Sequence, residues 1–124
     1  MSFHVAIWMD HAEAHVLDLA CDQTCIRRIH AKSKPHAPGH DPLAEHAYFE
    51  DIAKLLGPAH EVLLTGPGET KIAFALHLQS HHTESSRKVV GIETLEHPSD
   101  AQLAAYARKF FLRTDRMNGT PTAG

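Results

Sequence analysis

The chain begins with three strand-like segments, which end at Ala31. Phe3–Met9 is apolar at almost every position, which is typical of a central strand covered on both faces. Ala14–Ala20 follows after a turn, and Thr24–Ala31 then alternates isoleucine with arginine and histidine. Such alternation is typical of a more exposed strand nearer the edge of a sheet. Because the connections are short, the three segments predict an antiparallel meander.

From residue 41 onward the pattern changes to helices that alternate with strands. Asp41 and Pro42 are residue types preferred at a helix N-cap and first turn, and apolar residues then recur at helical spacing as far as Gly57. The remaining pattern predicts a strand over 61–65, a helix over 69–81, a strand over 88–93, and a last helix opened by a capping box at 99–102.

The predicted order of elements is β-β-β-α-β-α-β-α. Right-handed crossovers after the meander place the last two strands parallel beside the first. We therefore expect an α/β fold of the ribonuclease-H-like kind, a mixed five-stranded sheet with helices on its faces. Residues 1–116 are predicted to form a single domain, and the polar residues 117–124 a flexible tail.

Composition narrows the function classes. The 124 residues are 43% hydrophobic and 22% charged, which is typical of a globular domain. The formal net charge of −3 removes the usual argument for sequence-independent nucleic-acid binding, so RNA contact needs a local basic patch. Neither a secretory signal nor a membrane span is evident, and we expect a cytoplasmic protein. Cys21 and Cys25 are expected to be reduced thiols, with Cys25 packed inside its strand.

A nuclease is the first enzyme that this topology suggests. Two-metal nucleases need several carboxylates that converge on the central strands. Asp10 ends the first strand, and Glu50 or Asp51 could face it from the first helix, but the fourth strand ends in Thr65 and Gly66 instead of an acid. Asp10 is more simply explained as a turn residue. No nucleophile or catalytic set stands out, so we predict neither catalytic residues nor a cofactor.

The turn over residues 65–71 is a candidate anion site. It follows a strand and opens a helix, where backbone N–H groups and the helix dipole can bind phosphate. Gly66, Gly68 and Lys71 are the candidate contacts, although the spacing is not that of a P-loop. The alternative is an ordinary glycine-bearing turn between a strand and a helix.

Twelve histidines raise the possibility of a metal site. His77 and His81 are four residues apart on a predicted helix and could chelate a divalent ion. The sequence lacks H-E-x-x-H and any cluster with structural-zinc spacing. A metal-binding module, or a metal-dependent hydrolase that uses histidines with Asp10, is therefore kept as an alternative function.

Three segments carry a resemblance to a known group: VAIWMDHAEAHVLDL (residues 5–19), EVLLTGPGETKIAFALHL (61–78) and KVVGIETLEHPSDAQLAAYARKFF (88–111). They resemble a bacterial family of translational machinery proteins. That family is similar to the middle domain of the archaeal and eukaryotic class I release factor and of Pelota. The resemblance covers roughly residues 3–116 and rests on the order of elements, the G-P-G-x-x-K turn and the H-P-[ST]-D helix start.

The resemblance implies a role in translation, with one departure. In the release factor, the loop between the third strand and the first helix carries a Gly-Gly-Gln that promotes peptidyl-tRNA hydrolysis. Here the loop over residues 32–41 holds only Gly39 and no glutamine. We therefore expect a non-catalytic protein that associates with the ribosome or RNA. A homodimer that forms through an edge strand or a helix face is a further alternative. The expected contacts of the loop are Lys32, Lys34, His36 and His40, with Gly66, Gly68 and Lys71 beside them.

Overall fold

The computed structural model describes residues 4–19, 25–31 and 41–117. Its elements in chain order are β1 (His4–Met9), β2 (Glu13–Asp18), β3 (Cys25–His30), α1 (Pro42–Ala53), the 3₁₀ helix η1 (Lys54–Leu56), β4 (Glu61–Gly66), α2 (Thr70–His81), α3 (Thr83–Ser86), β5 (Val89–Thr94) and α4 (Asp100–Met117). Within these residues, no helix combines the length and apolarity needed to cross a membrane.

The five strands form one mixed sheet in the order β3-β2-β1-β4-β5. The first three are an antiparallel meander, with Ile7 opposite Val16. β4 pairs parallel to β1, with Ile7 opposite Leu64, and β5 pairs parallel to β4. The predicted fold class and strand arrangement are confirmed: the nearly continuous apolar strand is central, and the arginine-bearing strand lies at an edge.

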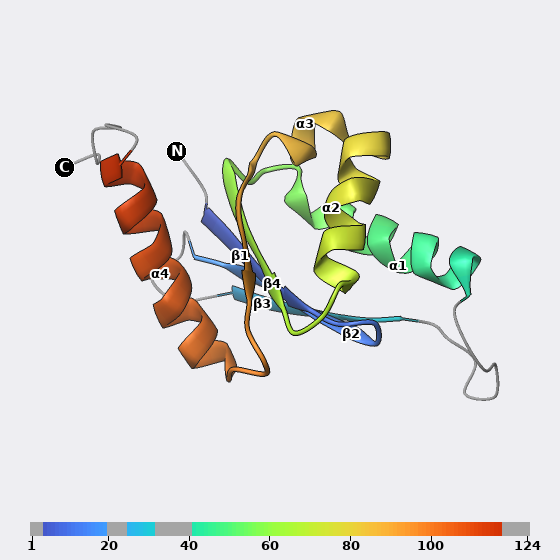
Figure 1. The fold of residues 1–124 in the computed structure, drawn as a ribbon, viewed down its shortest axis with the longest axis horizontal. Helices are drawn as coiled ribbons and strands as arrows, with labels where there is room; N and C mark the ends of the chain where they lie inside the picture. The colour runs from blue at the N-terminus through green and yellow to red at the C-terminus, as the bar shows by residue number, and fades with distance from the viewer. Residues whose placement is uncertain (1–3, 20–24, 32–40, 118–124) are drawn as a thin grey trace.

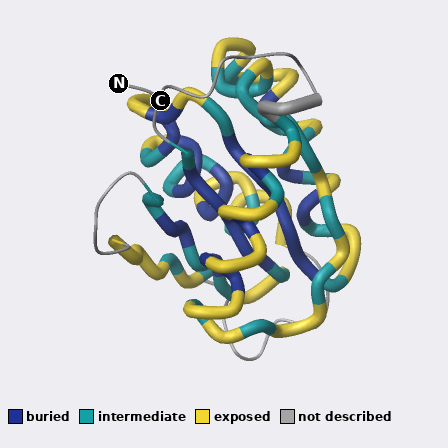
Figure 2. Tube along the Cα trace, turned by 90° about the vertical axis from the view of Figure 1, so that its left-hand side faces the viewer, coloured by how far each residue is buried: buried dark blue, intermediate teal, exposed yellow. Residues whose placement is uncertain are grey.

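Helices cover both faces of the sheet (Figure 1). α1 and α2 lie on one face, where Phe49, Ile52, Phe74 and Leu78 pack against alternate residues of β1 and β4. α4 lies alone on the other face, where it packs on the remaining residues of the central strands, including Trp8. The central strands are buried along their length, whereas exposed residues follow the outer helix surfaces and the turns (Figure 2). The domain is therefore three layers with two hydrophobic cores.

Both predicted helix caps are present. The Asp41 carboxylate accepts the backbone N–H groups of Leu43 and Ala44, at 3.1 and 3.3 Å. Ser99 and Gln102 form a reciprocal capping box, in which each side chain bonds the other residue's backbone N–H. The two caps fix where α1 and α4 begin, and thereby which face of each helix meets the sheet.

Three features differ from the sequence predictions. The short helices η1 and α3 were not expected, because segments of three or four residues carry too little periodicity to detect. α4 continues to Met117, one residue into the predicted tail, and residues 118–124 lie outside the described part of the chain. Cys25 is exposed and not packed, as are most residues of the edge strand β3.

Candidate functional site

The carboxyl ends of β1 and β4 meet at one edge of the sheet, where ligands of open α/β sheets commonly bind. Asp10 follows β1 here, and its Oδ1 accepts the backbone N–H groups of Ala12 and Glu13, both at 2.8 Å. The Asp10 carboxylate therefore closes the β1–β2 turn. Neither of the two three-residue groups able to hold a metal among the described residues contains Asp10.

Tyr48 of α1 reaches the same turn. Its hydroxyl donates to the backbone carbonyl of Asp10 at 3.0 Å, and its ring is buried. Burial, followed by the negative charges of Asp10 and Glu13, raises the pKa of Tyr48 far above its ordinary value. Tyr48 is therefore a neutral hydrogen-bond donor that ties α1 to the end of β1.

The turn between β4 and α2 brings Gly66, Gly68 and Lys71 together as the sequence predicted. Gly66 is buried at the end of β4, and its carbonyl accepts the Leu95 N–H at 3.1 Å. Lys71 is only 5% exposed, and its ammonium group donates to the Gly68 carbonyl. A phosphate would have to draw Lys71 away from this bond, whereas Gly68 is open to solvent. Phosphate binding at the turn stays a prediction.

A second cluster lies between α1 and the end of α2. The Nε2 atom of His77 lies 2.7 Å from Oε2 of Glu50, and Nε2 of His82 contacts the same oxygen. His77 is the least exposed of the three side chains, at 8%. Hydrogen bonds from His82 and then His77 lower the pKa of Glu50 from 4.5 to about 2. The carboxylate is therefore ionised over the whole physiological range.

Two further histidines adjoin this cluster. His81 lies one turn after His77, with ring centroids 4.7 Å apart, and the His46 ring of α1 lies 5.0 Å from that of His77. The predicted pair of His77 and His81 is thus side by side on α2. His46, His77 and His81 form one group of potential ligands, and Glu50, His77 and His82 form the other.

His82 was expected at the same helix end as this pair, whereas Glu50 and His46 were not expected to meet it. A signal was present: His46 and Glu50 are also four residues apart on a predicted helix. Two such pairs on helices that cover the same face of a sheet can meet side by side. His82 directly follows His81 as the C-cap of α2, so its place at this helix end could be read from the sequence, but its contact with Glu50 could not.

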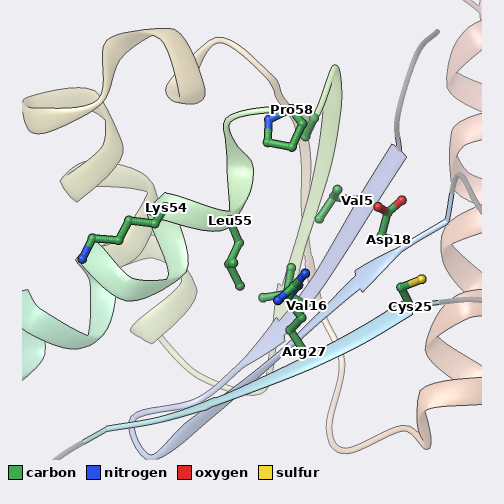
Figure 3. A pocket seen from close by; sticks show the side chains of 9 residues that line it. Val5, Val16, Asp18, Cys25, Arg27, Lys54, Leu55 and Pro58 are labelled. Atoms are coloured by element: carbon green, nitrogen blue, oxygen red, sulfur yellow. The ribbon is translucent and has the colours of Figure 1, made fainter.

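A groove of about 380 Å³ lies between η1 and the sheet (Figure 3). It is at the amino-terminal end of β1, opposite to the end that carries these turns. Val5 and Val16 supply apolar strand residues and Leu55 faces them from η1, while Arg27 and Cys25 of β3 line its polar side. Lys54 and Leu55 of η1, with Pro58 and Ala59 after it, form the wall that faces the strands. No pattern in the sequence indicated this groove.

The predicted basic contacts Lys32, Lys34, His36 and His40 lie outside the described residues. The residues that flank this segment, Ala31 and Asp41, are described. The Ala31 N–H donates to the Ala12 carbonyl at 2.8 Å, and Asp41 caps α1. β3 runs in the same direction as β1 and β4, so β3 ends on the side of the sheet that carries the β4–α2 turn.

No protein-family model and no curated protein sequence matches the chain. Solved structures do match. Pelota from Archaeoglobus fulgidus is 12% identical with a TM-score of 0.62, over 94% of this chain and 36% of Pelota. The archaeal translation termination factor aRF1 is 13% identical with a TM-score of 0.58, over 96% and 42%. Dom34 from S. cerevisiae, a translation termination-like factor involved in RNA quality control pathways and interacting with Hbs1, is 12% identical with a TM-score of 0.52, over 93% and 39%.

These similarities establish that the chain has the fold of a domain found in Pelota, aRF1 and Dom34. The chain spans about two fifths of the length of those proteins or less. The likeness therefore concerns one domain, and what the whole proteins do is a matter for proposal.

Proposed function

We propose that this protein is a translation-associated factor that binds the ribosome or RNA through residues 32–41 and does not hydrolyse peptidyl-tRNA. The observation that carries the proposal is the fold, which matches Pelota, aRF1 and Dom34 over more than nine tenths of this chain. Three translation-factor structures share it, although fold alone does not determine function.

Charge and position support the loop as the contact. Residues 32–40 include two lysines and two histidines and no acidic residue, in a chain whose formal net charge is −3. β3, which precedes this segment, ends on the same side of the sheet as the turn that holds Gly68. Three strand spacings of about 4.8 Å separate β3 from β4 in the sheet, so one stretch of phosphate backbone could reach both the loop and the turn.

The absence of hydrolysis is proposed from the composition of the same loop. Residues 32–41 contain Gly39 but no second glycine and no glutamine, so the Gly-Gly-Gln of the release factor has no counterpart there. At the adjacent edge, Asp10 is engaged in its turn and Tyr48 is held neutral by burial. These groups organise the backbone and supply no general base.

Co-sedimentation of the untagged protein with ribosomes, at low and moderate salt, tests the proposal. Wild-type protein is expected to comigrate with a subunit or the intact ribosome, and the double variant Lys32→Glu/Lys34→Glu is expected to lose comigration. Lys109→Glu/Arg113→Glu is the matched control, because it makes the same charge change at exposed positions of α4, on the other face of the sheet. Binding must weaken as salt rises if phosphate is contacted.

Two outcomes would contradict the proposal. Absence of the wild-type protein from every ribosomal fraction at low salt would leave only a shared fold. Equal loss of comigration in both double variants would show that net charge matters and that the loop has no special role.

A further inference from the structure

We propose that Glu50, His77 and His82 form a binding site for one divalent transition-metal ion of the zinc class. This site is independent of the proposed loop contact, since it lies between α1 and the end of α2. Its ligand set is two imidazole nitrogens and one carboxylate oxygen, a combination that binds zinc in many proteins.

The positions of the three donor atoms carry the inference. The two Nε2 atoms, of His77 and His82, approach a single oxygen of Glu50 from α2 and its C-cap. The potential ligand atoms of the group all lie within 4.8 Å of one another. Ligands at about 2.0–2.1 Å from a tetrahedral zinc are roughly 3.3 Å apart. Small side-chain rotations that part the oxygen from the nitrogens would therefore admit an ion.

The backbone aims these donors before any ion binds. His82 caps α2 with φ −140° and ψ 68°, outside helical geometry, so the chain turns there and its ring contacts Glu50. The His77 ring packs among Phe49 and Phe74, with centroids 5.4 and 6.5 Å away, and is thereby held in place. Rigid support of this kind reduces the cost of ordering ligands around a metal.

The proposed metal site is partly open to solvent, which would allow water to serve as an exchangeable fourth ligand. The side chains of Glu50 and His82 are each 32% exposed, so the cluster opens to solvent on one side. Three protein ligands and one open position, which water can fill, complete a tetrahedral zinc. A carboxylate ligand at Glu50 also offsets part of the charge of a divalent cation.

The neighbouring group of His46, His77 and His81 is the competing arrangement. It shares His77 but has no carboxylate, and both of its other members are exposed. Exposed imidazoles lose more conformational freedom when they bind, and three neutral ligands leave the ionic charge uncompensated. These differences favour the group that contains Glu50, and they define the control variants.

The test uses untagged, chelator-treated full-length protein and zinc chloride in isothermal titration calorimetry. One equivalent of zinc is expected to bind the wild type. Glu50→Gln and His82→Gln are expected to weaken binding by roughly 100-fold, since loss of even an outer partner of a metal ligand costs about 10–100-fold. His46→Gln and His81→Gln, matched changes at the adjacent histidines, are expected to stay within about threefold of the wild type, well under that range.

Cobalt substitution reads out the ligand set itself. The visible absorption of bound Co²⁺ should indicate a tetrahedral or five-coordinate nitrogen and oxygen site in the wild type and in His81→Gln, and should be lost in Glu50→Gln. Far-ultraviolet circular dichroism confirms that each variant is folded, and Glu50→Gln preserves side-chain shape for this purpose.

Three results would overturn the assignment. Failure of the wild-type protein to take up a stoichiometric ion at micromolar zinc would leave Glu50 as a carboxylate hydrogen-bonded to two histidines. Glu50→Gln and His82→Gln could bind as well as the wild type. Alternatively, His46→Gln and His81→Gln could lose as much affinity as those two variants, which would place the ion among the exposed histidines.

Discussion

Gly66 is the residue at which one added methyl group should damage the sheet most. It is buried at the end of β4, directly beside the last residue of β1. A Cβ at this position would lie 3.3 Å from the carbonyl carbon of Met9 and would overlap the oxygen bonded to that carbon. Gly66→Ala therefore forces β1 and β4 apart at their carboxyl ends.

The expected cost follows from two contributions. Forcing extra atoms into a well-packed interior costs about 1–3 kcal/mol. The displaced Gly66 carbonyl also accepts the Leu95 N–H at 3.1 Å, and weakening that bond adds about 0.5–1.5 kcal/mol. Gly66→Ala should lower the free energy of unfolding by about 1.5–4.5 kcal/mol, a large part of the 5–15 kcal/mol typical of a domain.

Urea unfolding followed by tryptophan fluorescence measures this change. Trp8 is the sole tryptophan of the chain and is 2% exposed, so its emission should shift as the domain unfolds. Gly68→Ala is the matched control, because a Cβ there meets no atom within 4 Å. The control should stay within about 0.5 kcal/mol of the wild type. Equal stability of the two variants would refute the argument from close approach.

Three further changes test other parts of the structure. Trp8→Phe removes an indole N–H that donates to two carbonyls after β5, and should cost about 1–3 kcal/mol in urea unfolding followed by circular dichroism. Glu50 has its pKa lowered from 4.5 to about 2 by His82 and then His77, so its stabilisation is complete above about pH 5 and is lost as pH falls toward 2. Acid titration of stability should therefore be shallower for Glu50→Gln than for the wild type over this window, and parallel curves would contradict the pairing. Lys71→Met keeps the buried stem and removes the ammonium group, so thermal unfolding should show a change within about 1 kcal/mol.

The order and arrangement of the main elements could be predicted because several independent signals agreed. The apolar run of β1 indicated a central strand, and the arginines of β3 indicated an edge. Asp41 and Ser99 marked helix starts that the structure confirms. The exposure of Cys25 could not be predicted, because it depends on which elements pack against the edge strand and not on the strand itself.

The candidate sites were predicted less completely, for a geometric reason. Helical spacing brings His77 and His81 together on one helix, and the sequence alone shows this. The contact with Glu50 depends on how two helices pack, which requires the sheet order. Once the order is known, right-handed crossovers from β3 to β4 and from β4 to β5 progress in one direction and place α1 and α2 on the same face.

The two proposed sites are connected by α1 and yet can be tested separately. Asp41 caps α1 where residues 32–40 end, and Glu50 lies nine residues later, about 13 Å along the helix. A metal at Glu50 would link α1 to the end of α2, whereas the proposed loop contact precedes the other end of α1. Loss of zinc binding in Glu50→Gln with unchanged ribosome comigration would therefore show two separate functions. Loss of both in that one folded variant would instead show that the metal positions α1, and through it the loop.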